Sequence, residues 1–175
     1  MRLNVVRLPG VRMPPGSRAV LVDLARRLDP ADLCVQLVLA DDACLRRLNR
    51  QYRGRNRPTD VLSFLYDHAT PRRQRRAANA RQPVAPVLVA GPDAELYVSL
   101  ARAAAQARAR KHALRCELML LVLHGMLHLQ GHDHVRARDA RRMRAAETPH
   151  LRWLARRTGW NPLLPLVPAM AQEEA

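Results

Sequence analysis

Hydrophobic residues follow two different spacings along this chain. Recurrence at intervals of three and four residues is typical of helices that face a core, whereas short runs that alternate or stay apolar are typical of strands. The first pattern predicts helices over residues 17–28, 42–52, 100–111 and 139–157. The second predicts strands over residues 4–8, 33–39, 61–64 and 95–98. A fifth helix, over residues 114–130, is apolar nearly all round and is therefore predicted to be buried on most sides.

Polar residues and glycines mark the ends of several of these elements. Ser17, Ser99 and one of the neighbouring aspartates Asp41 and Asp42 are predicted N-caps, because their side-chain oxygens can accept hydrogen bonds from the first helical turn. Gly54 is predicted to end the second helix in a left-handed conformation.

The interspersed strands and helices predict an α+β fold. We expect a small single-domain sandwich over residues 1–160, in which a short mixed β-sheet packs with about five helices. Residues 68–93 mix proline, glycine and an RRQRR run, and they are predicted to form a basic loop insertion. Residues 161–175 are predicted to be a proline-rich C-terminal tail.

The charge of the chain points to a polyanionic partner. The formal net charge is +15 for 175 residues, with 30 basic residues against 15 acidic ones. A field of this sign and size attracts polyanions and steers their approach. Nucleic acid is the preferred partner, and an anionic membrane or an acidic protein is the alternative.

Cysteine usage and the N-terminal segment favour a cytoplasmic protein. Cys34, Cys44 and Cys116 are odd in number, widely spaced and without a C-x-x-C pair, so each is predicted to be a small apolar filler in a reducing compartment. The first 16 residues are interrupted by proline and glycine before any apolar run of secretory length, so no signal peptide is expected. No stretch is long and apolar enough to span a bilayer.

Four of the 7 histidines fall within the eleven residues HGMLHLQGHDH, from His124 to His134. His124 and His128 are four apart, which places them one turn apart on the same face of the buried helix. Gly131 can adopt a left-handed conformation and turn the chain back, so that His134 approaches the same point. His132 is predicted to face away from it. The spacing therefore predicts three converging imidazoles at the end of the buried helix.

Three neutral imidazoles are a favoured ligand set for a catalytic Zn²⁺ ion, because they leave a fourth position open for water whose pKa falls to about 7. We predict one zinc ion per chain, in preference to nickel, copper or iron. Gly125 stands where H-E-x-x-H peptidases carry their glutamate base, which disfavours that kind of peptide hydrolysis. Asp133 is predicted either to orient a ligand or to stabilise the turn.

Two segments carry a resemblance to a known family. HGMLHLQGHDH resembles the H-G-x-L-H-L-x-G-x-D-H motif of the YbeY family of single-domain, metal-dependent endoribonucleases. LNRQYRGRNRPTDVLSF, residues 48–64, is similar to that family's L-N-x-x-Y-R-x-x-x-x-P-T-D-V-L-S-F. Both motifs are long, and they occur in the family's order. Weaker similarity extends from about Leu33 to Glu147.

The resemblance implies an endoribonuclease specific for single strands, which acts by zinc-dependent phosphodiester hydrolysis in 16S rRNA 3′-end maturation and ribosome quality control in the bacterial cytoplasm. The implied metal ligands are His124, His128 and His134, and these three together with Arg53 are the implied catalytic residues. A guanidinium at Arg53 could hold phosphate oxygens in two-point contact. The implied partners are rRNA and the small ribosomal subunit. Ribosomal proteins or an assembly GTPase are open as further partners, and neither DNA nor a membrane is expected.

Some positions depart from the family pattern. The family's Gly-Asp-Ile segment appears as Ala94-Glu95-Leu96, so any carboxylate role would move to Glu95, and Leu65 stands where proline is frequent. The basic loop and the tail are longer than the family leads us to expect. Two other functions stay open: a metal-dependent hydrolase of a peptide or an ester, and a non-catalytic ribosome assembly factor whose zinc is structural.

Overall fold

A computed structural model of the chain describes residues 1–28, 33–66 and 91–160. These residues form four strands and five helices, so the predicted α+β fold is confirmed. The strands are β1 (Arg2–Arg7), β2 (Cys34–Ala40), β3 (Val61–Leu65) and β4 (Ala94–Ser99). The helices are α1 (Ser17–Leu28), α2 (Asp42–Arg53), α4 (Leu100–Ala109), α5 (Leu114–Leu129) and α6 (Ala137–Thr158).

The strands form one mixed sheet in the order β1-β2-β4-β3. β1 and β4 both pair with β2 in parallel, whereas β3 pairs antiparallel with β4, with Ser63 opposite Leu96. β3 is therefore at the edge of the sheet. Successive strand residues face opposite sides. Leu96 belongs to one hydrophobic core, and its neighbour Tyr97 belongs to a second core on the other face.

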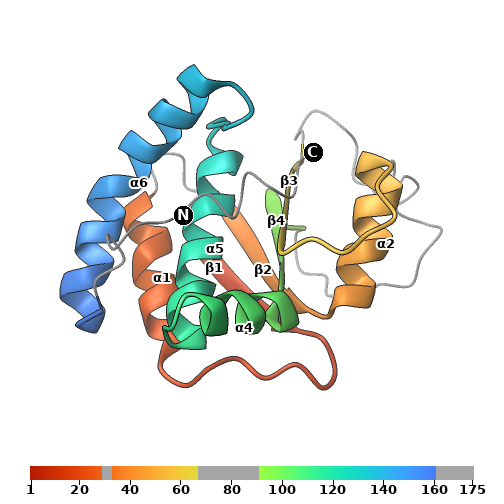
Figure 1. Cartoon of the computed structure of the whole chain (residues 1–175), viewed down its shortest axis with the longest axis horizontal. Helices are drawn as coiled ribbons and strands as arrows, with labels where there is room; N and C mark the ends of the chain where they lie inside the picture. Colours follow the sequence, from red (N-terminus) through yellow and green to blue (C-terminus); the bar gives the residue numbers. More distant parts are fainter. Residues whose placement is uncertain (29–32, 67–90, 161–175) are drawn as a thin grey trace.

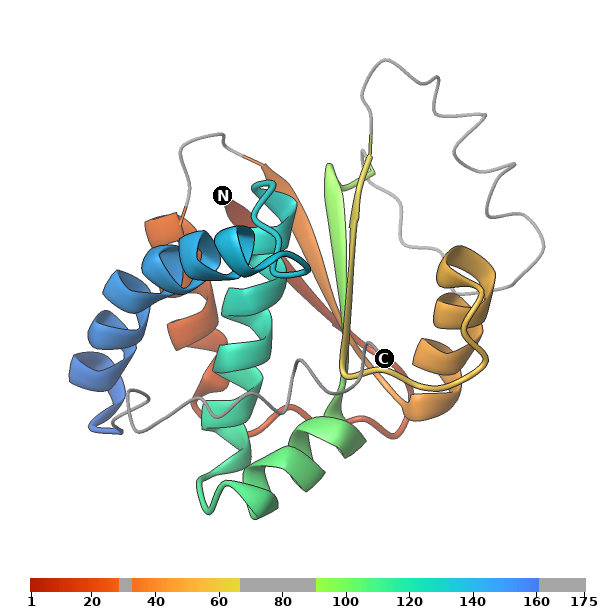
Figure 2. The ribbon, with the colours of Figure 1, turned by 45° about the horizontal axis from the view of Figure 1, so that its top comes forward.

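Helices cover both faces of the sheet (Figures 1 and 2). α1 and α5 pack on one face, and α6 lies on the far side of these two helices from the sheet. α2 covers the other face beside β3 and β4, and α4 crosses one end of the sheet. All but three residues of α5 are buried, as its nearly uninterrupted apolar sequence predicts.

Helix caps confirm most of the predicted boundaries. Asp41 caps α2 and accepts a hydrogen bond from the Cys44 N–H at 2.7 Å, and Gly54 ends that helix at φ 70°. Ser99 caps α4 through the Arg102 N–H at 3.2 Å. The prediction for Ser17 is wrong. Ser17 lies inside the first turn of α1, fully buried, and its hydroxyl has no hydrogen-bond partner among the described residues.

Two predicted segments fall largely or wholly outside the described residues: positions 68–90 of the basic loop and the tail at 161–175. The division into a domain over residues 1–160 and a tail stays a prediction. Within the described ranges, no helix has the length and apolar character needed to cross a bilayer. All three cysteines are free, and Cys44 and Cys116 are buried as predicted for apolar fillers.

Candidate metal centre and its cavity

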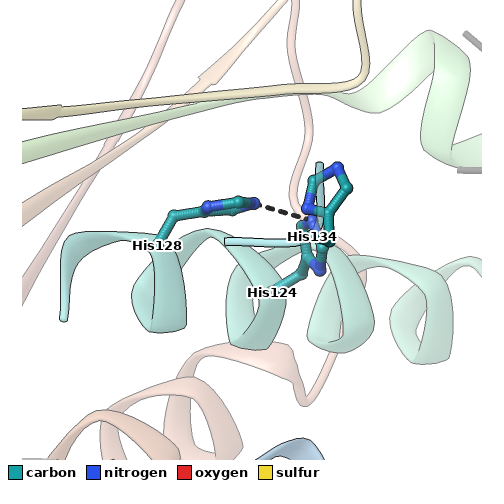
Figure 3. A group of neighbouring side chains, drawn as sticks. All are labelled: His124, His128 and His134. Carbon is teal, nitrogen blue, oxygen red and sulfur yellow. Dashed lines mark hydrogen bonds between the residues drawn. The ribbon is translucent and has the colours of Figure 1, made fainter. Parts of the chain in front are cut away.

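The last turn and a half of α5 and the segment that follows it bring three histidines together (Figure 3). His124 and His128 stand one turn apart on α5, and their Nε2 atoms are 3.1 Å apart. The His134 ring lies 5.1 Å from the His124 ring and 4.9 Å from the His128 ring, measured between centroids. One nitrogen from each ring lies within 4.8 Å of the other two. The predicted convergence is confirmed.

The turn after α5 brings His134 next to His124 and His128. Gly131 adopts φ 86°, a conformation that side chains beyond glycine rarely tolerate. The His132 N–H donates to the Leu127 carbonyl at 3.1 Å, which closes the end of the helix. Asp133 accepts hydrogen bonds from the N–H groups of His134 at 2.7 Å and Val135 at 3.3 Å. Of the two roles predicted for Asp133, the structure therefore shows the stabilisation of the turn.

The three rings can hold a metal ion. Nitrogens that bind Zn²⁺ tetrahedrally at 2.0–2.1 Å lie about 3.3 Å from one another. The two Nε2 atoms on α5 are 3.1 Å apart, and the three ligand nitrogens all lie within 4.8 Å of one another. Burial, reinforced by the neighbouring His124 and His134, lowers the pKa of His128 to about 4. His128 is thus neutral at physiological pH, which is the form that coordinates a metal. Donor type, spacing and protonation all fit a divalent cation that accepts nitrogen ligands.

A carboxylate from α6 contacts the metal centre, and no sequence motif indicated it. Glu147 Oε1 lies 3.1 Å from His124 Nδ1, and the two side chains are only 15% and 10% exposed. A carboxylate on Nδ1 favours the proton there and leaves Nε2 as the lone-pair donor. Nε2 is the His124 nitrogen that faces His128. Glu147 is therefore placed to orient one ligand and to favour the tautomer that leaves its Nε2 unprotonated.

The histidines form one wall of a cavity of about 510 Å³. The opposite wall comes from the end of α2, from the segment that leads into β3, and from the first turn of α4. Four arginines line the cavity: Arg53, Arg55, Arg57 and Arg102. The structure thus places Arg53 and the three histidines around the same cavity. A cavity with metal ligands on one wall and guanidinium groups on the other suits an anionic, phosphate-bearing molecule.

Two buried polar residues fix the arginine-bearing wall. Asp60 is 6% exposed, and it accepts hydrogen bonds from the Val61 N–H at 2.8 Å and the Gln106 amide at 2.9 Å. The Asn49 amide donates to the Arg57 carbonyl at 2.8 Å. These bonds tie the segment between α2 and β3 to its neighbours, so the position of the arginines relative to the histidines is defined by the fold.

Gly125 allows a close approach between α5 and the sheet beside the cavity. A Cβ atom at this position would collide with the Leu96 side chain and would lie 3.1 Å from Val61 Cγ2. Without a side chain, α5 can approach β4 and β3 closely. Gly125 and Val61 both line the cavity beside the histidines. The glycine after the first histidine of the motif thus has a packing function.

Glu95, to which any role of the family's aspartate would move, lies away from the metal centre. Glu95 Oε2 accepts hydrogen bonds from the hydroxyls of Tyr66 at 2.5 Å and Tyr97 at 3.1 Å, on the α2 face of the sheet. Leu96, the next residue, contacts Gly125 on the opposite face. Glu95 does not line the metal-side cavity, and the carboxylate found at the metal centre is Glu147.

Comparison with known proteins agrees with this geometry. The family model described as Endoribonuclease YbeY matches residues 18–155, most of the chain. The chain belongs to the YbeY family. Three similar relatives are each named Endoribonuclease YbeY. The protein from a Roseiflexus species is 42% identical over 121 residues, which cover 69% of this chain and 69% of that protein. The protein from Desulfitobacterium hafniense is 39% identical over 116 residues, 65% of this chain and 66% of that protein.

The third relative is longer than the matched region. The Myxococcus xanthus protein is 37% identical over 134 residues, which cover 75% of this chain but 38% of that protein. A similar fold is found in the solution structure of protein TM1509 from Thermotoga maritima. Its TM-score is 0.54 at 24% identity, with coverage of 96% of this chain and 97% of that one.

Proposed function

We propose that this YbeY-family chain is a zinc-dependent endoribonuclease that hydrolyses phosphodiester bonds in single-stranded RNA. The proposal rests on one observation: three imidazoles that can hold a metal ion share a cavity with four arginines. The activity that the relatives' names state and the net charge of +15 support the same substrate class. We further propose that the substrate is 16S rRNA near its 3′ end, on the small ribosomal subunit in the cytoplasm, with a role in ribosome quality control.

His124, His128 and His134 would hold the metal ion. When bound, zinc supplies a Lewis acid that polarises a phosphoryl oxygen and lowers the pKa of water at its open position. Glu147 would keep the proton of His124 on Nδ1 and so leave Nε2 able to bind the ion. Three neutral ligands leave the full positive charge of the ion available to the substrate.

The arginines would bind the RNA backbone at the cleaved bond. Arg53 follows the last buried turn of α2, and its guanidinium is exposed to the cavity rather than packed in the core. A guanidinium can contact two phosphate oxygens at once and offset the charge that develops on them during hydrolysis. Lysine could offer only a point charge, so arginine is the better residue at this position.

Cleavage of a labelled single-stranded RNA by the zinc-loaded protein tests the proposal. We expect cleavage that a chelator abolishes and added zinc restores, with duplex RNA cut much more slowly. His128→Ala should abolish cleavage, and Arg53→Lys should lower kcat by about 100-fold or more, the usual effect of removing one transition-state contact. Intact RNA together with hydrolysis of a peptide or an ester by the same sample would contradict the proposal. Strong RNA binding without turnover would instead indicate an assembly factor.

The proposed rRNA substrate needs a separate test. Precursor 16S rRNA within purified small subunits should be cut near its 3′ end by the wild-type protein and not by His128→Ala. Cleavage at random single-stranded positions would remove the assignment to 16S maturation while leaving the ribonuclease activity standing.

A further inference from the structure

The outward face of α6 carries a row of arginines that the metal centre does not use. Helical residues three or four apart lie on one face. Met143, Glu147, Leu151 and Leu154 share the face that packs inward. Five exposed arginines share the opposite face, and we call them the α6 arginine face: Arg138, Arg141, Arg142, Arg152 and Arg156.

The α6 arginine face has few acidic residues in its own helix to offset its charge. α6 contains seven arginines and two acidic residues, a difference of 7 − 2 = +5. Of the two acids, Glu147 points inward to His124, and Asp139 lies in the first turn. Among the described residues, none of the five arginines forms an ion pair or a hydrogen bond with a carboxylate. Arg157, on a different side of α6, does contact Asp23, at 3.5 Å.

This arrangement is unfavourable for the isolated helix. Arg138 and Arg142, and likewise Arg152 and Arg156, are like charges four residues apart, which destabilises a helix. Arg138 also lies near the N-terminus, where the helix dipole disfavours a cation. Folding therefore does not explain the row, whereas a bound polyanion would offset both effects.

The row begins at the edge of the cavity. His134 and Val135 line the cavity, and α6 starts two residues later, at Ala137. Figures 1 and 2 show α6 leaving the end of α5 that carries His128 and running along the outer side of α1. From Arg138 to Arg156 the row extends about 27 Å at 1.5 Å per residue. A strand held in the cavity can thus continue onto the α6 arginine face.

We propose that the α6 arginine face binds the sugar-phosphate backbone of single-stranded RNA that extends beyond the cavity. This inference rests on the proposed function for the identity of the polyanion. An anionic membrane fits less well, because Met143, Leu151 and Leu154, on the apolar face of α6, are buried in the core and so are not available to insert into a bilayer. Arginine contacts to phosphates carry no sequence information, so the face would contribute affinity and orientation rather than base specificity.

The test compares two variants of equal net charge. The face variant replaces all five arginines of the α6 arginine face with glutamine. The control variant carries five arginine-to-glutamine substitutions at exposed positions near the start of α1, the end of β1 and the ends of α4 and α5 remote from the histidines: Arg7, Arg12, Arg18, Arg108 and Arg115. Both variants lower the net charge from +15 to +10 (15 − 5).

Binding is measured by fluorescence anisotropy, with a chelator present to prevent cleavage, for a short single strand that spans the cavity alone and for a long one. We expect the face variant to bind the long strand at least about tenfold more weakly than the control variant does, because it loses contacts with phosphates. Each lost contact should also reduce the slope of log K against log salt concentration by about 0.7. Binding and zinc-dependent cleavage of the short strand should be unchanged. Thermal unfolding should show that both variants remain folded.

Equal loss of long-strand affinity in the two variants would overturn the proposal, because net charge alone would then explain the effect. Unchanged long-strand affinity in the face variant would also overturn it, most clearly if binding to vesicles of anionic lipid were lost instead. Failure of the wild-type protein to cleave the short strand would contradict the proposed function. It would leave the comparison of long-strand binding interpretable.

Discussion

Replacing Glu147 should weaken the metal centre although Glu147 is not one of the three ligands. Glu147→Ala removes the acceptor for His124 Nδ1, and Glu147→Gln keeps a neutral oxygen in its place. The two side chains are 15% and 10% exposed and their atoms lie 3.1 Å apart, so water competes little for this hydrogen bond. Loss of such an outer partner typically lowers metal affinity by 10–100-fold, or about 1.4–2.8 kcal/mol. We expect the loss of zinc affinity to lie near the upper end of this range for Glu147→Ala and near the lower end for Glu147→Gln.

The dissociation constant for zinc would be measured by competition with a chromophoric chelator. Asp139→Asn is the matched control, because it removes a carboxylate from the first turn of the same helix without touching a histidine. Nitrogen-15 NMR of the His124 ring supplies a readout independent of activity. The wild-type ring should carry its proton on Nδ1, and the Glu147→Ala ring should populate both tautomers.

The reasoning fails if Glu147→Ala binds zinc as tightly as the wild-type protein does. It fails as well if Asp139→Asn weakens zinc binding by the same factor, since the effect would then come from the charge of α6 and not from the contact. A lowered affinity with an unchanged His124 tautomer would show that Glu147 holds α6 against α5 without orienting the ligand.

Three further predictions concern the walls of the cavity. Gly125→Ala should destabilise the protein by about 1–2 kcal/mol, since the collision with Leu96 outweighs the gain in helix propensity. Gly91→Ala, where no atom lies within 4 Å, should change the thermal midpoint little. Asp60→Ala should lower the free energy of unfolding, measured in urea, by about 1–3 kcal/mol, because the Gln106 amide and the Val61 N–H lose their acceptor. Zinc at 100 times its dissociation constant should stabilise the protein by about 2.7 kcal/mol, and a thermal midpoint unaffected by zinc and chelator would rule out binding to the folded state.

Features that depend on near neighbours in the chain could be predicted from the sequence. Asp41 caps α2 through a residue three positions away, and Gly54 ends the same helix. His124 and His128 converge because of the helical repeat, and His134 joins them because of the turn at Gly131. In each case the interaction closes within about ten residues, so the spacing of residue types determines the geometry.

Features that depend on how elements pack could not be predicted in the same way. Glu147 reaches His124 across 23 positions, and this contact exists because α6 crosses α5 at one particular point. Ser17 fits an N-cap by residue type, but the chain places it inside the first turn of α1 and buries its hydroxyl. Glu117 interrupts an apolar helix and is fully buried, and it is compensated by Arg110 and His112 at 2.6 Å each. The carboxylates can be located in the sequence, but the basic residue that each one contacts depends on how the helices pack.

Gly125 links the packing of the sheet to the chemistry of the cavity. A glycine inside a long helix costs about 1 kcal/mol relative to alanine, so its presence in α5 indicates a close approach, although the sequence alone cannot identify the neighbour. The structure identifies Leu96 and Val61, and Val61 begins the strand that the arginine-bearing segment enters. A side chain at position 125 would press on Leu96 of β4 and on Val61 of β3, and Val61 lines the same cavity as Arg53 and the histidines. In the proposed function phosphate contacts both walls at once, so Gly125→Ala should lower kcat/KM by more than its effect on stability accounts for.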